Sequence, residues 1–191
     1  MDMATKDPRS PRTPRKIRWT RAHLASLPDD GNRYEVLDGE LLVTPQARFR
    51  HQRIALRLST AVERYCEAHG VGVVVGPGAV VFDNNELQPD LQVIPGPGPA
   101  ALDPEWTDLP LPILVVEVLS SGSRRHDLVT KREAYLRIGI PEYWVVDVVK
   151  RHVLVCRPGS DASVVVTDTL HWKPVPHAPA LAIDVRALLE D

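Results

Sequence analysis

Apolar and polar positions in the N-terminal half of the chain follow two clear periods. Two apolar runs, 33–37 and 40–43, flank the dipeptide Asp38-Gly39. Such a dipeptide favours a two-residue β-hairpin turn, because both positions tolerate positive φ. Apolar residues then recur at helical spacing through residues 47–69, which end at a glycine. The pattern predicts a hairpin followed by a long helix, with a short helix from Thr20 before them.

Short apolar segments separated by turn residues dominate the rest of the chain. The strands that we expect are 71–75, 79–82, 89–94, 113–119, 143–148, 152–157 and 164–167. Residues 127–138 predict a second helix, and Asp184 predicts a cap for a last helical turn. The proline-rich stretch 95–112 predicts a long loop. This order predicts an α/β fold of the α+β kind, with a mixed central sheet flanked by helices.

The distribution of charge divides the chain into two parts. Residues 1–21 carry seven basic and two acidic groups, a local charge of +5, so the remaining 170 residues sum to −7. Three prolines interrupt the basic segment, and it has no apolar period. We therefore expect a disordered basic arm over residues 1–18 and a single folded domain over residues 19–191. The arm is available for contacts with phosphate groups, although its prolines and lack of an apolar period favour a simply solvated terminus.

The composition excludes several classes of protein. Only two cysteines are present, Cys66 and Cys156, and no CxxC pair occurs. This count argues against both a disulfide framework and a cysteine-based zinc site. No run approaches the ~20 apolar residues that a membrane-spanning helix needs. We expect a soluble, cytoplasmic protein without a membrane partner.

Glu117 is the most unusual residue of the sequence. It lies in the middle of Ile113–Leu119, the most apolar run of the chain. A buried carboxylate without a partner costs several kcal/mol, or its pKa shifts until it is neutral. The strand therefore predicts a cation, a basic side chain or a metal ion beside Glu117.

Two further residues can supply that environment. Asp90 begins a predicted strand and meets Glu117 at one sheet edge if the two strands are neighbours. Two such carboxylates suit Mg²⁺ or Mn²⁺. Lys131 lies on the same helical face as Leu128 and Tyr135, so it points toward the sheet. A structural ion pair between Lys131 and Glu117 without catalysis explains this spacing equally well.

The order and spacing of these residues resemble a known family. The segments that carry the resemblance are Pro89-Asp90, 116–120, the Asp127, Lys131 and Tyr135 series, 139–147, the Asp-Gly-Glu of the hairpin, and His51-Gln52. Together they are similar to the Uma-type restriction endonuclease family of the PD-(D/E)XK nuclease superfamily. The similarity covers roughly residues 19–157. It implies a restriction-endonuclease-like fold with a metal site at one edge of the sheet.

The resemblance also implies roles for individual residues. Asp90 would be the metal-binding aspartate, Glu117 the second acidic ligand, and Glu40 an upstream acid that completes the metal site. The common motif has lysine two residues after the second acid, where this chain has Leu119. Lys131 of the following helix would take its place.

The activity that the resemblance implies is Mg²⁺-dependent hydrolysis of DNA phosphodiester bonds. A homodimer would suit duplex DNA, and the strands after residue 150 leave a sheet edge to protect. The alternative is a catalytically silent nuclease fold that binds nucleic acid or another protein. The acidic charge of residues 22–191 favours this alternative, because a nuclease should attract phosphate.

Overall fold

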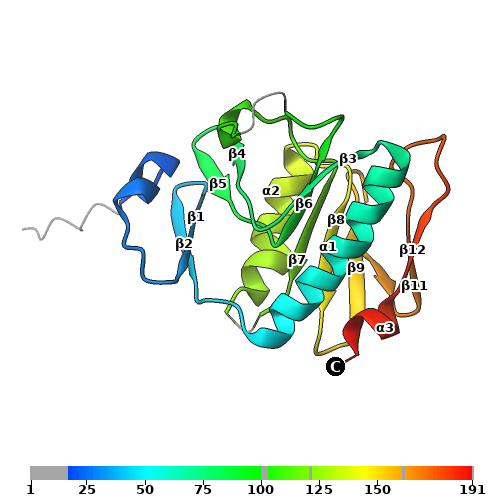
Figure 1. Ribbon diagram of the computed structural model, residues 1–191. Helices are drawn as coiled ribbons and strands as arrows, with labels where there is room; N and C mark the ends of the chain where they lie inside the picture. Colours follow the sequence, from blue (N-terminus) through cyan, green and yellow to red (C-terminus); the bar gives the residue numbers. More distant parts are fainter. Residues whose placement is uncertain (1–16, 100–102, 121, 161, 191) are drawn as a thin grey trace, which may run out of the picture.

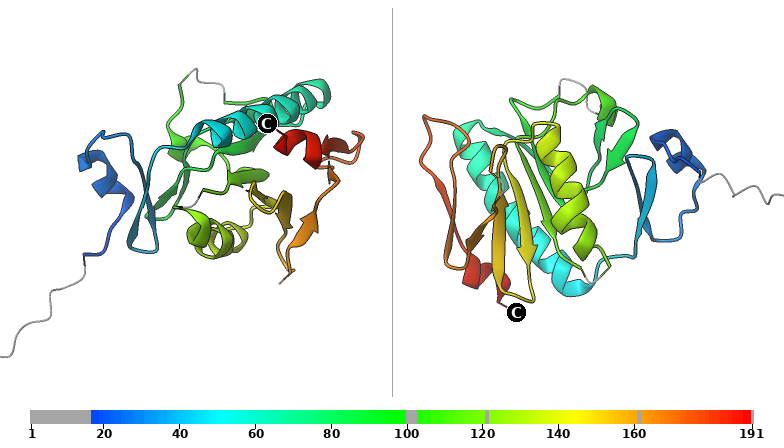
Figure 2. Two further views of the ribbon diagram at one scale, coloured as in Figure 1. Left: turned by 90° about the horizontal axis from the view of Figure 1, so that it is seen from below. Right: turned by 180° about the vertical axis from the view of Figure 1, so that it is seen from behind.

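The protein is described here from a computed structural model that covers residues 17–99, 103–120, 122–160 and 162–190. Most of the predicted basic arm, residues 1–16, lies outside the described residues. Two helices enclose a sheet: α1 (Phe49–His69) crosses one face and α2 (Arg132–Arg137) covers the other (Figures 1 and 2). The predicted α+β fold with helices on both faces of a mixed sheet is confirmed.

The main sheet lies at the centre of the molecule. In the described part of the chain it has six strands in the order β10-β9-β8-β7-β6-β3. Its strands are β3 (Gly72–Val75), β6 (Leu91–Pro95), β7 (Leu114–Val118), β8 (Tyr143–Asp147), β9 (His152–Cys156) and β10 (Val164–Val166). β7 and β8 are parallel, and the other neighbouring pairs are antiparallel. The parallel pair accommodates the crossover helix that carries Lys131.

A smaller N-terminal sheet packs beside the main sheet. Its order is β2-β1-β5-β4, with β1 (Arg33–Leu37), β2 (Glu40–Thr44), β4 (Val80–Phe82) and β5 (Asn85–Leu87). The predicted hairpin is confirmed, and Asp38 and Gly39 have φ values of 51° and 90°. The sequence did not predict β5. Its three residues lack a hydrophobic run, and pairing with β1 and β4 stabilises the strand.

The C-terminal segment forms a two-stranded ribbon that sequence analysis missed. It consists of β11 (Thr169–Trp172) and β12 (Leu181–Asp184), followed by helix α3 (Val185–Leu189). The predicted cap is confirmed, because Asp184 accepts hydrogen bonds from the backbone amides of Arg186 and Ala187. Leu170 and Trp172 pack into the core under α1.

The remaining helices are short. The predicted N-terminal helix is a 3₁₀ helix, η1 (Arg21–Ser26), and a second, η2 (Trp106–Asp108), lies within the stretch predicted as a loop. The predicted second helix is confirmed, but its first part, η3 (His126–Lys131), is a π-helix that leads into α2. Within the described residues, no helix combines the length and apolar character needed to cross a membrane.

The strand β7 separates two hydrophobic cores. Leu114, Val116 and Val118 pack in the core beneath α1. Val115 and Leu119 pack in the other core, with Tyr135 of α2. Because side chains of a strand alternate between its faces, Glu117 points to the α2 side, with Val115 and Leu119. The strand therefore directs a carboxylate into an apolar layer, where it requires a partner.

Candidate active site

Glu117 and Asp90 lie on adjacent strands. The antiparallel register between β6 and β7 pairs Leu91 with Val116. One residue further along the same register, Asp90 comes opposite Glu117, at the point where β6 begins. The backbone amide of Val118 donates a hydrogen bond of 2.8 Å to Asp90 Oδ2 and fixes the aspartate there. β6 and β7 are therefore neighbours, which is the condition for Asp90 and Glu117 to meet at one edge.

Lys131 holds three carboxylates together. Its Nζ lies 2.8 Å from Glu35 Oε1, 2.9 Å from Glu117 Oε1 and 3.4 Å from Asp127 Oδ1. The exposed fraction of each of these side chains is 1% or less. We call this set, Glu35, Glu117, Asp127 and Lys131, the carboxylate–lysine cluster. It lies between the main sheet, the N-terminal hairpin and the helix η3.

The cluster contains more acidic groups than one lysine can neutralise. Burial raises the pKa of Glu117 well above its usual value, and Lys131 only partly opposes this because Asp127, Asp90 and Glu35 raise it further. Burial raises the pKa of Asp127 as well, against the effect of Lys131. The pKa of Lys131 is raised despite its burial, because the carboxylates favour the ammonium form. The cluster therefore combines a charged lysine with carboxyl groups of unusually high proton affinity.

Glu35 is the member of the cluster that sequence analysis missed. Its Oε1 also accepts a hydrogen bond of 2.7 Å from the backbone amide of Gln88, whereas its Oε2 is buried and has no hydrogen-bond partner in the described part of the chain. A signal was present in the sequence. Glu35 alternates with Tyr34 and Val36 in β1, so it shares the face of the buried Leu37.

The helix η3 determines how Lys131 enters the cluster. A π-helical turn widens the backbone, and such turns occur frequently at functional sites. Asp127 lies four residues before Lys131 and shares its buried face. Asp127 does not cap the helix, because it lies inside η3 and its side chain is buried. Its spacing from Lys131 was the available signal.

Asp90 has a separate set of partners. Its Oδ1 lies 3.1 Å from Arg33 Nη1, and its Oδ2 lies 3.0 Å from His51 Nε2. Burial alone would raise the pKa of Asp90, but the hydrogen bond and charge of His51, with the charge of Arg33, lower it below its usual value. Asp90 is therefore an ionised carboxylate. His51 lies in the first turn of α1, and its side chain is 9% exposed and contacts Asp90.

Glu40 lies elsewhere on the hairpin. It begins β2 opposite Leu37, close to the turn, and its side chain is exposed. The acidic group that the hairpin contributes to the cluster is Glu35, which lies opposite Leu42 further from the turn.

The donor chemistry of the site suits a hard divalent cation. Asp90 and Glu117 offer carboxylate oxygens, and the unpartnered Oε2 of Glu35 offers a third. A divalent cation would also offset the repulsion between carboxylates that adds to the effect of burial on the pKa of Glu117. Within the described residues, no group of three or more His, Cys, Asp or Glu side chains is already arranged to hold a metal ion. In this arrangement Lys131 pairs with Glu35 and Glu117, and Arg33 pairs with Asp90.

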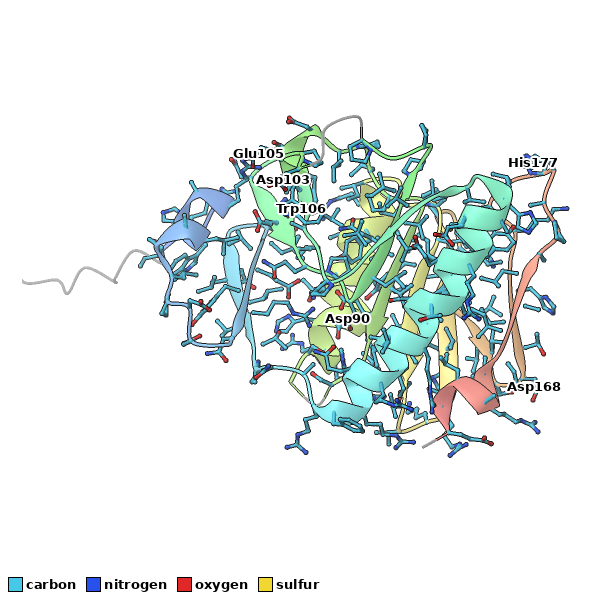
Figure 3. All side chains as sticks on the ribbon, in the orientation of Figure 1. Asp90, Asp103, Glu105, Trp106, Asp168 and His177 are labelled. Atoms are coloured by element: carbon cyan, nitrogen blue, oxygen red, sulfur yellow. The ribbon has the colours of Figure 1, made fainter. Side chains whose placement is uncertain are left out.

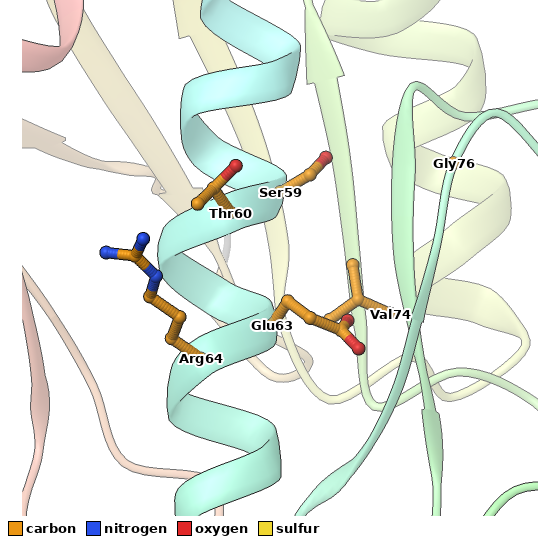
Figure 4. Close-up of a pocket in the computed structure, with 6 residues that line it drawn as sticks. All are labelled: Ser59, Thr60, Glu63, Arg64, Val74 and Gly76. Carbon is orange, nitrogen blue, oxygen red and sulfur yellow. The ribbon is translucent and has the colours of Figure 1, made fainter.

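A cavity of about 400 Å³ lies apart from this cluster. It is bounded by α1 and the segment from β3 to Gly76, and its lining includes Glu63 and Arg64 (Figure 4). None of its lining residues belongs to the carboxylate–lysine cluster. The chemistry of the buried groups, rather than the size of this cavity, identifies the candidate site. Figure 3 shows Asp90 at the centre of the molecule, beside α1.

Comparison with solved structures defines the class of protein. The crystal structure of a "putative nuclease belonging to DUF820" from Anabaena variabilis ATCC 29413 has a TM-score of 0.69 to this chain at 17% sequence identity. The match covers 90% of this chain and 99% of that chain. The protein thus belongs to the same class of mixed α+β fold as that structure.

The sequence assigns the chain to a particular family within that class. Residues 21–186 match the Uma2 family, whose description is "Putative restriction endonuclease". The chain belongs to this family, which confirms the resemblance found in the sequence. No curated protein matches the chain.

Proposed function

We propose that this protein is a divalent-metal-dependent endonuclease that hydrolyses DNA phosphodiester bonds. One observation carries the proposal: the buried pair of Glu117 and Lys131 lies beside Asp90, on the adjacent strand. Burying this many ionisable groups is costly unless they have a function or complete pairing. The pairing is incomplete, because Glu35 Oε2 has no partner in the described part of the chain.

The metal site of the proposal consists of Asp90 and Glu117. Glu35 is the better third candidate than the exposed Glu40, because it lies in the cluster beside Glu117 and Lys131. Carboxylate oxygens favour Mg²⁺ or Mn²⁺ over zinc. When bound, such an ion lowers the pKa of a coordinated water and polarises a phosphoryl oxygen.

Lys131 acts on the reacting groups through its ammonium. The raised pKa keeps Nζ protonated, so it donates hydrogen bonds and stabilises negative charge that develops on the phosphate. The surrounding carboxylates hold Nζ in one position, and burial excludes bulk water from it. Arg33, beside Asp90, provides a second fixed positive charge for the phosphate.

The protein acts as a homodimer in this proposal. The strand β10 ends the main sheet, and its Val164 and Val165 side chains are 54% and 57% exposed. An apolar edge strand of this kind favours pairing with a second chain. Light scattering that gives the monomer mass at micromolar concentration would remove the dimer from the proposal.

The activity is tested with supercoiled plasmid DNA and Mg²⁺ or Mn²⁺. We expect nicking by the wild-type protein, and loss of at least a hundredfold in rate for Asp90→Asn and for Glu117→Gln, on the order of the losses when a key transition-state contact is removed. Asp103→Asn and Glu105→Gln are matched controls, because both side chains are exposed and lie far from Asp90 in Figure 3. Absence of metal-dependent nicking, or equal nicking by the Asp90 variant and its control, contradicts the proposal.

A second candidate function is a catalytically silent module that binds nucleic acid or another protein. One observation favours it: Glu35, Glu117 and Asp90 each have a basic side chain as a partner, Lys131 or Arg33. Calorimetric titration with Mn²⁺ separates the two functions. Binding that Asp90→Asn abolishes and Asp103→Asn preserves supports the enzyme, whereas no metal binding supports the module.

A further inference from the structure

A polar pocket opens onto Asp90. Its volume is about 260 Å³, and it lies where the start of β1, the segment before α1, the first turns of α1 and the segment before β6 meet. We call it the Asp90 pocket. Its polar lining residues are Asn32, Arg33, Gln46, Gln52, Gln88 and Asp90. The pocket therefore connects Asp90 with the molecular surface.

The lining combines a charged end with neutral walls. Arg33 and Asp90 form the charged end, and the Arg33 guanidinium is held by Asp90 and by the backbone carbonyl of Gln88. The walls carry four carboxamides, each of which both donates and accepts hydrogen bonds. Carboxamides of this kind pair with the edges of nucleobases, and an arginine pairs with phosphate. The pocket offers complementary groups for both parts of a nucleotide.

The rest of the lining suits the faces of a base. Pro45 and Pro77 border the pocket, and Ala47 and Ala55 are the other apolar residues of its wall. These side chains are small or rigid, so they lose little conformational entropy when a ligand covers them. An unpaired base exposes apolar faces as well as polar edges.

The size of the pocket limits what can enter it. Sites for drug-sized molecules have volumes of roughly 300–1,000 Å³. At about 260 Å³, the Asp90 pocket lies just below that range and has room for about one nucleotide. An intact double helix cannot enter.

The depth of the candidate site below the surface also excludes an intact duplex. The Asp90 side chain is only 8% exposed, and Glu117 and Lys131 are 1% exposed. A duplex is stiff over about 150 base pairs and holds its phosphates on the outside of a rod. Bringing one of them to a recessed carboxylate requires the strand to leave the helix. A single strand bends into the pocket without that cost.

Charge favours the single strand further. Residues 22–191 carry a net charge of −7. A duplex has a higher charge density than a single strand, so its repulsion from an acidic surface is greater. We propose that the Asp90 pocket admits one unpaired nucleotide, and that the substrate is single-stranded or locally unpaired DNA. This inference rests on the proposed function and specifies its substrate.

Binding by a cleavage-deficient chain tests the inference without requiring catalysis. Fluorescence anisotropy with the Glu117→Gln variant compares a labelled single-stranded oligonucleotide with a blunt duplex of the same sequence. We expect at least tenfold tighter binding of the single strand, and a loss of about tenfold with Gln52→Ala added, which is the effect of one good base contact. Gln52 is an exposed helical position where alanine preserves the fold.

Asn84→Ala is the matched control, because this amide is exposed and lies outside the Asp90 pocket. Equal affinity for duplex and single strand, or equal effects of Gln52→Ala and Asn84→Ala, would overturn the inference. The proposed function can fail separately from this inference. If single-strand binding is selective and depends on Gln52, but the wild-type protein does not nick plasmid DNA, the pocket is supported and the catalysis is contradicted. Nicking of intact duplex that Gln52→Ala leaves unchanged contradicts the pocket alone.

Discussion

The Nζ atom of Lys131 lies 2.9 Å from Glu117 Oε1, and both side chains are almost completely buried. The two residues come from β7 and from the helix that follows it, so the β7–β8 crossover connection itself creates the contact. This lysine occupies the position of a countercharge in the described arrangement. In the proposed function, it would also stabilise negative charge on the phosphate. The same geometry thus serves stability and the proposed chemistry.

Lys131→Met should destabilise the fold strongly. The substitution leaves Glu35 and Glu117 buried without their cation, and breaking a buried pair in this way costs about 3–5 kcal/mol. Urea denaturation at neutral pH measures the change in the free energy of unfolding.

The double variant Lys131→Met/Glu117→Leu provides the control for this prediction. It should be more stable than the sum of the two single effects by about 0.5–3 kcal/mol, because the residues are in direct contact. Strict additivity, or a loss of less than 1 kcal/mol for Lys131→Met, would show that Lys131 does not stabilise the buried carboxylates.

Asp147 should make stability depend on pH at the acidic end. Burial raises its pKa, but hydrogen bonds from Arg124 (2.7 Å to Oδ2) and from the backbone amide of Lys150 (3.0 Å to Oδ1) outweigh this and lower it below 3.8. The folded state therefore favours the ionised form. Its contribution to stability is present above the unfolded pKa and is lost as pH falls through the folded pKa.

The Asp147→Asn variant tests this dependence. At pH 7 it should cost about 1.5–3 kcal/mol, the range for hydrogen bonds to charged groups, and the difference from wild type should shrink below pH 3.8. Asp168→Asn is the matched control, because its ion pair with Arg186 is largely exposed and contributes about 1 kcal/mol or less. A constant difference between pH 7 and pH 3 would contradict the assigned direction of the pKa shift.

Both cysteines should be unreactive in the native protein. Cys66 and Cys156 are free and buried, and burial, with Glu63 nearby, raises the pKa of Cys66 to about 12. Thiolate is the reactive form, so native protein at pH 8 should not react with a thiol reagent. In denaturant, both thiols should be titrated. Rapid modification of either one before unfolding would contradict the packing around it.

Residues 1–18 should contribute non-specific affinity for DNA. The segment holds six basic and two acidic groups, whereas the rest of the chain is acidic. Deleting it should make the dependence of single-strand binding on salt shallower, by about 0.7 in log–log slope for each lost phosphate contact. Anisotropy titrations at several salt concentrations measure this slope. An unchanged slope means that the arm makes no such contacts.

Sequence analysis located most helices and strands because their signals are local. The period of α1, the Asp-Gly turn of the hairpin and the apolar run of β7 each depend on neighbouring residues. Two C-terminal strands and β5 were missed, since they are short and depend on pairing. The division of the described strands among three sheets also depends on contacts distant in sequence.

The candidate site was also predicted from the sequence only in part. The residue pattern was enough to predict that Glu117 and Lys131 need partners, because a charge within an apolar strand and a charge on the inward face of a helix are both costly when alone. The identity of those partners follows from the folded arrangement alone. That arrangement adds Glu35 and Asp127 to the pair, and it joins Asp90 to Arg33 and His51. The reason is physical: periodicity tells which face of an element is buried, whereas the packing of separate elements decides which buried groups meet.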